Sequence, residues 1–214
     1  MHRIPYWRLS GYYFFYFAFV GAFSPYFGLY LKSLSFSAWD ISVLMSQMQL
    51  MRLFGPYVWG VLVDRIGHRV PIIRLTSLLT LLVFSAFFLS SAFATCLVAM
   101  GFFSLFWVAA LPLVETLTFD HLRDNSAGYG RIRLWGSIGF MVAVLATGPM
   151  LDRLGVPSLL WAIVATLVGI ACCAMAIREA PGGRAHGDHP PVSEILRQTR
   201  VRALLGACFS MSAA

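Results

Sequence analysis

Long apolar stretches divide the sequence into candidate membrane-spanning segments. A helix needs about 20 apolar residues to cross the hydrocarbon core of a bilayer, so the block at 75–114 is long enough to cross twice, with a split near Ser90, Ser91 and Thr95. Helices are favoured over barrel strands because the apolar residues are continuous rather than alternating with polar ones. We therefore predict six spanning helices, in apolar blocks at 9–31, 41–63, 75–114, 134–151 and 154–177.

The composition supports a membrane protein. Hydrophobic residues make up 59% of the 214 residues and charged residues only 12%, whereas soluble domains have about 25% charged residues. This excludes an ordinary soluble enzyme. The four cysteines lie inside apolar blocks without paired spacing, which indicates neither a disulfide framework nor a zinc site. No metal site is predicted, because the only candidate group, His186, Asp188 and His189, falls in a tract rich in proline and glycine.

The basic residues are distributed unevenly between the two sides of the predicted spans. Thirteen of the 16 lysines and arginines fall on one side, Lys32 and Arg153 fall on the other, and Arg52 lies within a span. Basic residues are enriched in cytoplasmic loops, so we expect a multi-pass protein of a bacterial-type inner membrane with its N terminus in the cytoplasm. This placement also explains the net charge of +7, and a nucleic acid partner is not expected.

The predicted spans define three regions of the chain. Residues 1–178 are predicted to form a six-span bundle, 179–202 a cytoplasmic linker, and 203–214 the truncated start of a seventh span. The linker is assigned from its proline and glycine content. At about 1.5 Å per residue, the last region would reach roughly half way across a bilayer.

A short motif occurs twice in the sequence. GVLVDRIG at 60–67 ends the second span and GPMLDRLG at 148–155 ends the fifth, with the shared Gly, Asp, Arg and Gly positions 88 residues apart. A repeat of three spans places its two copies in opposite directions through the membrane, which is typical of secondary transporters. The alternative is that the motif only forms a tight turn between helices, in which glycine adopts a positive φ.

The first copy of the motif, extended to His68 and Arg69, resembles the signature of the major facilitator superfamily. In that family the signature lies in the cytoplasmic loop between the second and third helices, and His68 stands where arginine or lysine is usual. The resemblance implies an all-α integral membrane protein: the six-helix N-terminal bundle of the major facilitator fold, built from two inverted three-helix repeats, plus a partial seventh helix. It also implies a gating role for the motif residues Gly60, Asp64, Arg65, Gly67 and Arg69.

Further segments narrow the resemblance. The aromatic stretch at 12–30 and the segments at 114–115 and 129–133 resemble the first, fourth and fifth helices of lactose-permease-like carriers. Over almost the whole chain, including LMSQMQLMRLFGPYVWG, ALPLVETLTFDHLR and YGRIRLWGSIGF, the sequence resembles the 3-phenylpropionic acid transporters. At Phe140 phenylalanine stands in place of the tryptophan of lactose permease. The resemblance implies four substrate-binding residues: Glu115, Arg133, Ser137 and Phe140.

Charges inside the membrane are candidate binding groups in their own right. Arg52 lies in the middle of its span, where a charge costs about 2.5–3.5 kcal/mol, so it must face protein or a water-filled cavity. Glu115 and Arg133 lie near the same side and are placed to form an ion pair. We predict that Arg52 or Arg133 binds an anionic cargo, because a guanidinium donates two parallel hydrogen bonds to a carboxylate. Tyr16 and Trp107 are among the aromatic residues that would face its ring. The alternative is a structural role for each charge, as a strut between helices or a hairpin ion pair.

Together with these residues, the resemblance therefore implies a secondary active transporter, a proton symporter for a small organic acid such as 3-phenylpropionate, which works by alternating access without a cofactor. A sugar or nucleoside symporter and a truncated half-carrier that does not transport are the alternatives. Direct coupling to ATP is not expected without a Gly-x-x-x-x-Gly-Lys loop. An intramembrane protease is not expected because all five histidines lie outside the spans, and the chain is predicted not to be an enzyme. The expected partners are a small-molecule substrate, the lipid bilayer, and either a separate second half or a second copy of the chain.

Overall fold

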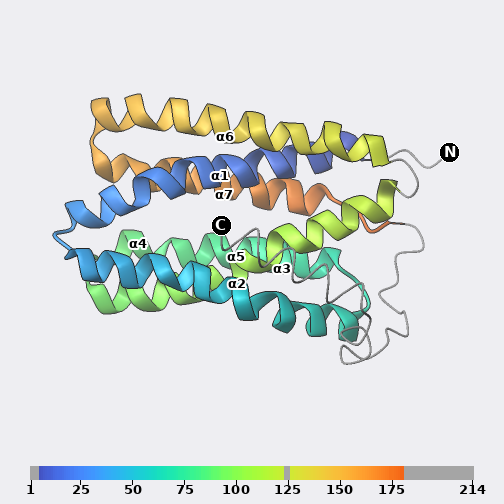
Figure 1. Ribbon diagram of the computed structural model, residues 1–214, viewed down its shortest axis with the longest axis horizontal. Coiled ribbons are helices and arrows are strands. Elements are labelled where there is room, and N and C mark those ends of the chain that lie inside the picture. The colour runs from blue at the N-terminus through green and yellow to red at the C-terminus, as the bar shows by residue number, and fades with distance from the viewer. Residues whose placement is uncertain (1–4, 123–125, 181–214) are drawn as a thin grey trace, which may run out of the picture.

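The computed structural model describes residues 5–122 and 126–180, and these residues are almost entirely helical (Figure 1). The predicted seventh span at 203–214 lies outside the described residues. So does the linker at 179–202, apart from Glu179 and Ala180, and with it the group His186, Asp188 and His189. The described elements are α1 (Tyr6–Ser33), α2 (Ala38–Ile66), α3 (Val70–Phe84), α4 (Ala86–Leu89), α5 (Phe93–Leu122), α6 (Ser126–Leu154), the 3-10 helix η1 (Val156–Ser158) and α7 (Leu159–Ala176).

The helices form six long segments, the number predicted, because α3 and α4 together make one segment, Val70–Leu89. The apolar block at 75–114 is interrupted at residues 90–92, close to the predicted split. Most helices extend a few residues beyond the predicted blocks. A large difference is at α6, which begins at Ser126, eight residues before its apolar block, and includes Arg131 and Arg133 in its first turns. The apolar pattern marks the hydrocarbon core of the bilayer, whereas helices continue into the polar interface.

The packing of the helices shows two inverted repeats, one of α1 to α4 and the other of α5 to α7. In Figure 1 one layer consists of α1, α6 and α7, and the other of α2, α3 and α5. The first helix of each repeat packs against the second and third segments of the other: α1 against α6 and α7, and α5 against α2 and α3. Corresponding helices run in opposite directions, which confirms the repeat predicted from the duplicated motif.

Both copies of the motif end in a glycine with a positive φ. Gly67 has φ of 74° and its N–H donates to the carbonyl of Val63 at 2.8 Å; Gly155 has φ of 81° and its N–H donates to the carbonyl of Leu151 at 2.9 Å. Glycine enters this conformation without the steric penalty of a Cβ atom. Both glycines thus end their helices with a positive φ, but their ψ angles differ: Gly67 has ψ of −1° and is left-handed helical, whereas Gly155 has ψ of 162° and is extended.

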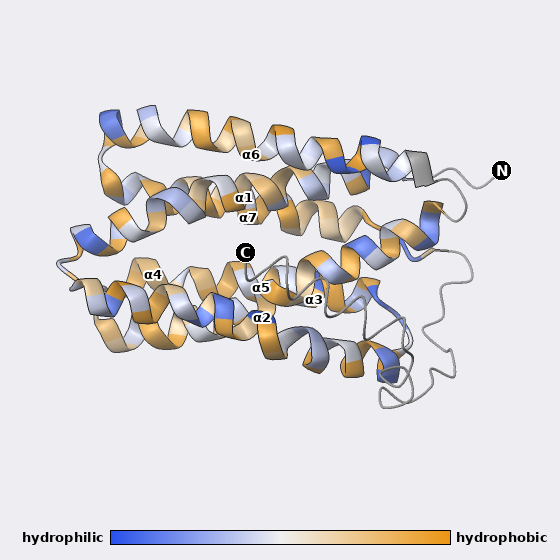
Figure 2. Cartoon of the chain, in the orientation of Figure 1, coloured by the Kyte–Doolittle hydropathy of each residue, from blue (hydrophilic) through white to orange (hydrophobic). Residues whose placement is uncertain are grey.

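The helix α2 is less apolar than the other spanning segments. Five segments of the described chain are long and apolar enough to cross a membrane, and α2 is not among them, although it has 29 residues. Polar side chains at Ser42, Ser46, Gln49 and Arg52 interrupt its apolar sequence (Figure 2). Polar residues in a spanning helix usually face protein or a water-filled cavity, so the composition of α2 indicates that one of its faces lines a cavity.

The helices α1 and α6 approach each other closely at glycines. A Cβ atom added to Gly21 would lie 2.6 Å from the carbonyl oxygen of Phe140, and one added to Gly139 would overlap the carbonyl oxygen of Phe14. The obstacle in both cases is backbone, which cannot move aside as a flexible side chain can. This contact fixes the separation of α1 and α6.

Replacing Gly139 by alanine is expected to destabilise the bundle by about 1–3 kcal/mol, as overpacking of a tight contact does. Thermal unfolding of the purified chain in detergent measures the effect as a lower Tm. Gly28→Ala on α1 is the matched control, because a Cβ atom there meets nothing within 4 Å. Equal Tm values for the two variants would contradict the close packing of α1 on α6.

Candidate functional site

A cavity of about 450 Å³ lies between α1, α2 and α5. This volume is in the range of about 300–1,000 Å³ that is usual for small-molecule sites. Arg52 of α2 is exposed to it and is the only charged residue of its lining. The remaining lining combines three aromatic residues, two methionines and a valine with four neutral polar residues: Phe19, Val20, Phe23, Ser24, Ser42, Met45, Ser46, Met48, Gln49 and Trp107.

Stacked aromatic rings support the wall of this cavity. Trp107 of α5 lies between two rings of α1: that of Tyr16, parallel within 7° at a centroid distance of 4.4 Å, and that of Phe19, at 4.1 Å. Phe103, one turn earlier on α5, stacks on Trp107 at 6.0 Å. Aromatic pairs of this kind stabilise by about 0.5–1.5 kcal/mol beyond the area that they bury. The stack therefore holds α1 and α5 together where both line the cavity.

Glu115 and Arg133 belong to a second cluster. It lies nearer the arginine-rich end of the bundle, the end that carries Arg65, Arg69 and Arg74. The hydroxyl of Tyr129 donates to Glu115 Oε1 at 3.3 Å. The guanidinium carbon of Arg133 lies 3.9 Å from the centroid of the Phe17 ring. The expected ion pair between Glu115 and Arg133 is not formed. The guanidinium of Arg133 packs on the aromatic face of Phe17 rather than pairing with the carboxylate of Glu115. Gly136 leaves room for this contact, since a Cβ atom there would lie 2.9 Å from Arg133 Nη1.

The six predicted substrate-binding residues therefore do not converge on one cavity. Arg52 lines the cavity, and Tyr16 lies behind its wall, where it stacks on Trp107. Ser137 and Phe140 are exposed on α6 and are not part of the cavity lining. Several lining residues were not predicted: Phe19, Phe23, Met45, Met48 and Gln49. Gln49 precedes Arg52 by three residues, and this polar spacing of one helical turn was the available signal.

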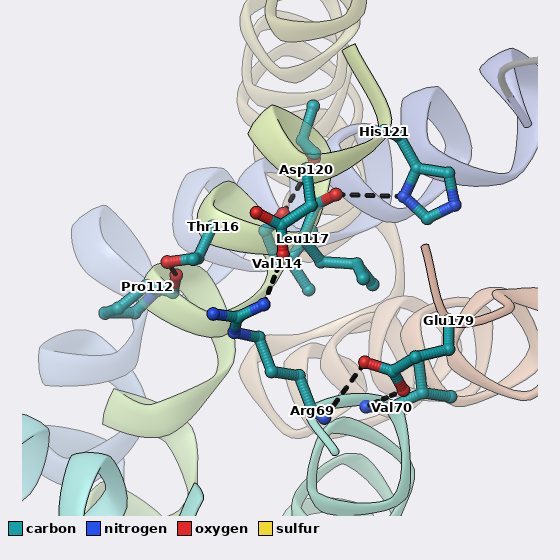
Figure 3. A network of polar contacts seen from close by, with 10 residues as sticks. Arg69, Val70, Pro112, Val114, Thr116, Leu117, Asp120, His121 and Glu179 are labelled. Atoms are coloured by element: carbon teal, nitrogen blue, oxygen red, sulfur yellow. Dashed lines mark hydrogen bonds and ion pairs between the residues drawn. The ribbon is translucent and has the colours of Figure 1, made fainter. Parts of the chain in front are cut away.

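The predicted gating residues differ in their contacts. Arg69 forms an ion pair with Asp120 of α5, the one ion pair among the described residues (Figure 3). Asp64 and Arg65 are exposed and take part in no such pair. A small cavity of about 220 Å³ is lined by Gly60, Asp64 and Arg69, together with residues of α5. The motif thus faces the end of α5, and Asp120 was its unpredicted partner.

The ends of α3 and α7 cap each other next to this motif. The carboxylate of Glu179, just after α7, accepts hydrogen bonds from the backbone N–H groups of Arg69 and Val70 at 3.1 Å each (Figure 3). In return, the guanidinium of Arg74 on α3 donates to the carbonyl of Ile177 at 2.8 Å and to two further carbonyls of α7. A carboxylate at a helix N terminus and a cation at a C terminus each complement the helix dipole. Glu179, assigned to the linker from sequence, therefore contacts the bundle directly.

Comparisons with known proteins agree with this architecture. The model of the MFS_1 like family matches residues 6–211. The probable 3-phenylpropionic acid transporter of Escherichia coli K12 is 28% identical over 144 residues, which cover 67% of this chain and 38% of that protein. The maltose permease of Geobacillus stearothermophilus is 29% identical over 203 residues, which cover 92% of this chain and 50% of that protein. The chain thus spans half or less of the length of these relatives.

The fold is also found in solved structures. The crystal structure of the nucleoside transporter NupG aligns with a TM-score of 0.73 at 18% identity, over 92% of this chain and 47% of that chain. A substituted form of NupG aligns with a TM-score of 0.78 at 16% identity, over 88% of this chain and 48% of that chain. The matched segment of the family model covers far more than half of the sequence. The chain therefore belongs to the MFS_1 like family of the major facilitator superfamily.

Proposed function

We propose that the chain is the half of a proton-linked carrier that contributes a cation and an apolar wall to the binding of a small organic acid. The observation that carries the proposal is the presence of Arg52, Phe19 and Trp107 on one cavity of about 450 Å³. A guanidinium binds a carboxylate by two parallel hydrogen bonds, and aromatic walls favour an aromatic ring by burial and ring packing. An acid that carries a phenyl ring combines both features, and one relative is described as a probable 3-phenylpropionic acid transporter.

Transport by alternating access requires a second bundle on the open side of this cavity. The face of α2 next to Arg52 exposes Leu53, Phe54 and Tyr57, and on α6 Leu145 is similarly exposed. In this proposal a second six-helix bundle, from a longer carrier or from a second copy of the chain, packs on α2 and α6 and completes the site. The arginine-rich end, with Arg69 and Arg74, faces the cytoplasm of a bacterial-type cell. A half-carrier that does not transport remains the alternative if no second bundle is supplied.

A sugar or a nucleoside is the second candidate cargo. Ser42, Ser46 and Gln49 place hydroxyl and amide groups on the same cavity, and such groups hydrogen-bond neutral polar ligands. The relatives include a maltose permease, and the solved structures include a nucleoside transporter. Uptake of labelled cargo is measured in the presence of an excess of unlabelled phenylpropionate, maltose or uridine. Only a compound of the transported class lowers this uptake, so the competition distinguishes the three classes.

The replacement Arg52→Gln in the complete carrier is expected to raise the apparent KM for 3-phenylpropionate by about 30-fold or more. Losing one partner of a desolvated, hydrogen-bonded charge pair costs about 2–5 kcal/mol. Uptake of the radiolabelled acid into proteoliposomes measures the effect. Arg52→Lys keeps the positive charge but not the planar guanidinium, so its apparent KM is expected to lie between those of the wild type and Arg52→Gln.

Arg153→Gln, at the exposed far end of α6, is the matched control and should leave uptake unchanged. Equal amounts of each variant in the membrane fraction establish that insertion is intact. Unchanged uptake by Arg52→Gln would contradict the assignment of an anionic cargo to this cavity.

Glu115 is the proposed proton-responsive group of this half, because it is half-buried in α5 and hydrogen-bonded to Tyr129. The replacement Glu115→Gln keeps the shape but cannot release a proton. Accumulation driven by an inside-alkaline pH gradient is expected to be lost, whereas exchange of labelled for unlabelled cargo persists. Asp152→Asn, exposed at the end of α6, should affect neither. Gradient-driven accumulation that survives Glu115→Gln would assign coupling to residues elsewhere.

A further inference from the structure

Two adjoining cavities lie at the end of the bundle opposite the arginine-rich end. One, of about 900 Å³, lies between the end of α1, the interruption at 90–92 and the start of α7, with Ser33, Ser90 and Ser91 on its wall. The other, of about 720 Å³, runs along α3 and α7 between leucine side chains. Phe88, Leu89 and Trp161 line both cavities. The two cavities are therefore one continuous groove with a polar end and an apolar end.

The apolar end of the groove has the depth of one membrane leaflet. It extends along the third spanning segment from Leu89 back to Leu78, eleven residues along the chain. At 1.5 Å per residue this is about 16 Å, and half of a hydrocarbon core of 30 Å is about 15 Å. The whole segment, Val70–Leu89, has 20 residues, enough to cross the core. Leu89 therefore lies near the boundary of the hydrocarbon region, and Leu78 lies near its middle.

The walls of the groove change from apolar to polar at this boundary. In the deeper part Leu82 is 66% exposed, and at the boundary Leu89 is 85% and Trp161 is 67% exposed. Trp161 packs edge-to-face on Phe88 with a centroid distance of 5.0 Å. Exposed tryptophan is typical of the membrane interface, where it contacts headgroups and acyl chains together. Beyond Trp161 the lining carries serine hydroxyls and the non-helical backbone of residues 90–92.

A basic side chain lies beside the polar end. Lys32 belongs to the last turn of α1, next to Ser33 of the cavity wall. It is exposed and forms no ion pair with the described residues. An exposed ammonium group at the interface attracts the phosphate of a lipid, and its long apolar stem lets it reach toward the headgroups. The groove thus offers hydroxyl groups where a phospholipid carries its phosphate and leucine where it carries an acyl chain, and the exposed Lys32 neighbours its polar end without being part of the lining.

We propose that this groove binds one phospholipid of the leaflet opposite the arginine-rich side. An acyl chain lies between α3 and α7 against Leu78, Leu82 and Val164, and the phosphate lies toward Lys32 and Ser91. The bound lipid fills the gap between the third spanning segments of the two repeats. This site is separate from the cavity of Arg52, so it does not depend on which cargo the carrier binds.

Photocrosslinking of the purified chain tests the proposal. The probe is phosphatidylglycerol with a diazirine in the middle of one acyl chain, added at equimolar ratio in detergent, and the crosslinked peptides are mapped by mass spectrometry. Crosslinks are expected to concentrate on residues 78–89 and 161–164. Val98 on α5 is 58% exposed but lies outside the groove lining, so its peptide is the internal comparison. Equal labelling per exposed residue around Val98 and in the groove would overturn the proposal, whatever any variant does.

Two pairs of variants locate the lipid within the groove. Leu82→Trp fills the apolar end and is expected to lower crosslinking of residues 161–164 several-fold, whereas Val98→Trp, its matched control outside the groove, leaves it unchanged. Lys32→Gln is expected to weaken labelling by phosphatidylglycerol about fivefold, the effect of one basic residue near a membrane surface. Arg153→Gln, on the same side but outside the lining, should have no such effect. Unaltered labelling in Leu82→Trp with a wild-type Tm would exclude the acyl site, and unaltered labelling in Lys32→Gln would exclude the phosphate contact.

Discussion

The structure depends on the requirement that every backbone polar group within a bilayer find a partner inside the protein. Helices satisfy this along their length, but the groups at their ends stay open. At the arginine-rich end, the third spanning segments of the two repeats provide hydrogen-bond partners for each other's open groups. The carboxylate of Glu179 accepts hydrogen bonds from the first N–H groups of α3, and the guanidinium of Arg74 donates to the carbonyl groups at the end of α7. Further along, the stack of Tyr16 and Phe19 on Trp107 joins the first helices. Two repeats that run in opposite directions are thus held at an end and in the middle, and the cavity of Arg52 lies beside the stack.

Much of the fold could be predicted from the sequence, because a helix that crosses a bilayer needs about 20 consecutive apolar residues, and blocks of this length are easily recognised. The six segments, the split of 75–114 and the inverted repeat are confirmed by the structure. Helix ends were predicted less well, since hydropathy marks the hydrocarbon core and the helix α6 continues through Arg133 into the interface. The lower hydropathy of α2 was also missed. Its average is lowered by the polar residues that line the cavity, which are the ones of interest for function.

The candidate site was harder to predict, because it depends on how helices rotate and approach. A charge in a span must face protein or water, and Arg52 lines the cavity. Which charges meet could not be read from their positions along the chain. Arg133 rests on Phe17 rather than pairing with Glu115, because Gly136 opens a space on α6 that only the packed helices define. Asp120 and Glu179 are distant from Arg69 in sequence, and nothing local to Arg69 indicated either contact.

The capping of α3 by Glu179 has a mechanical consequence for the chain that follows. The described chain ends at Ala180, one residue beyond a carboxylate bonded to the opposite repeat. A pull on the chain beyond this point is divided between α7, which carries Glu179, and α3, which holds its carboxylate. Through Arg69 and its ion pair with Asp120 it also reaches α5. Tension applied at this one point is therefore shared by helices of both repeats.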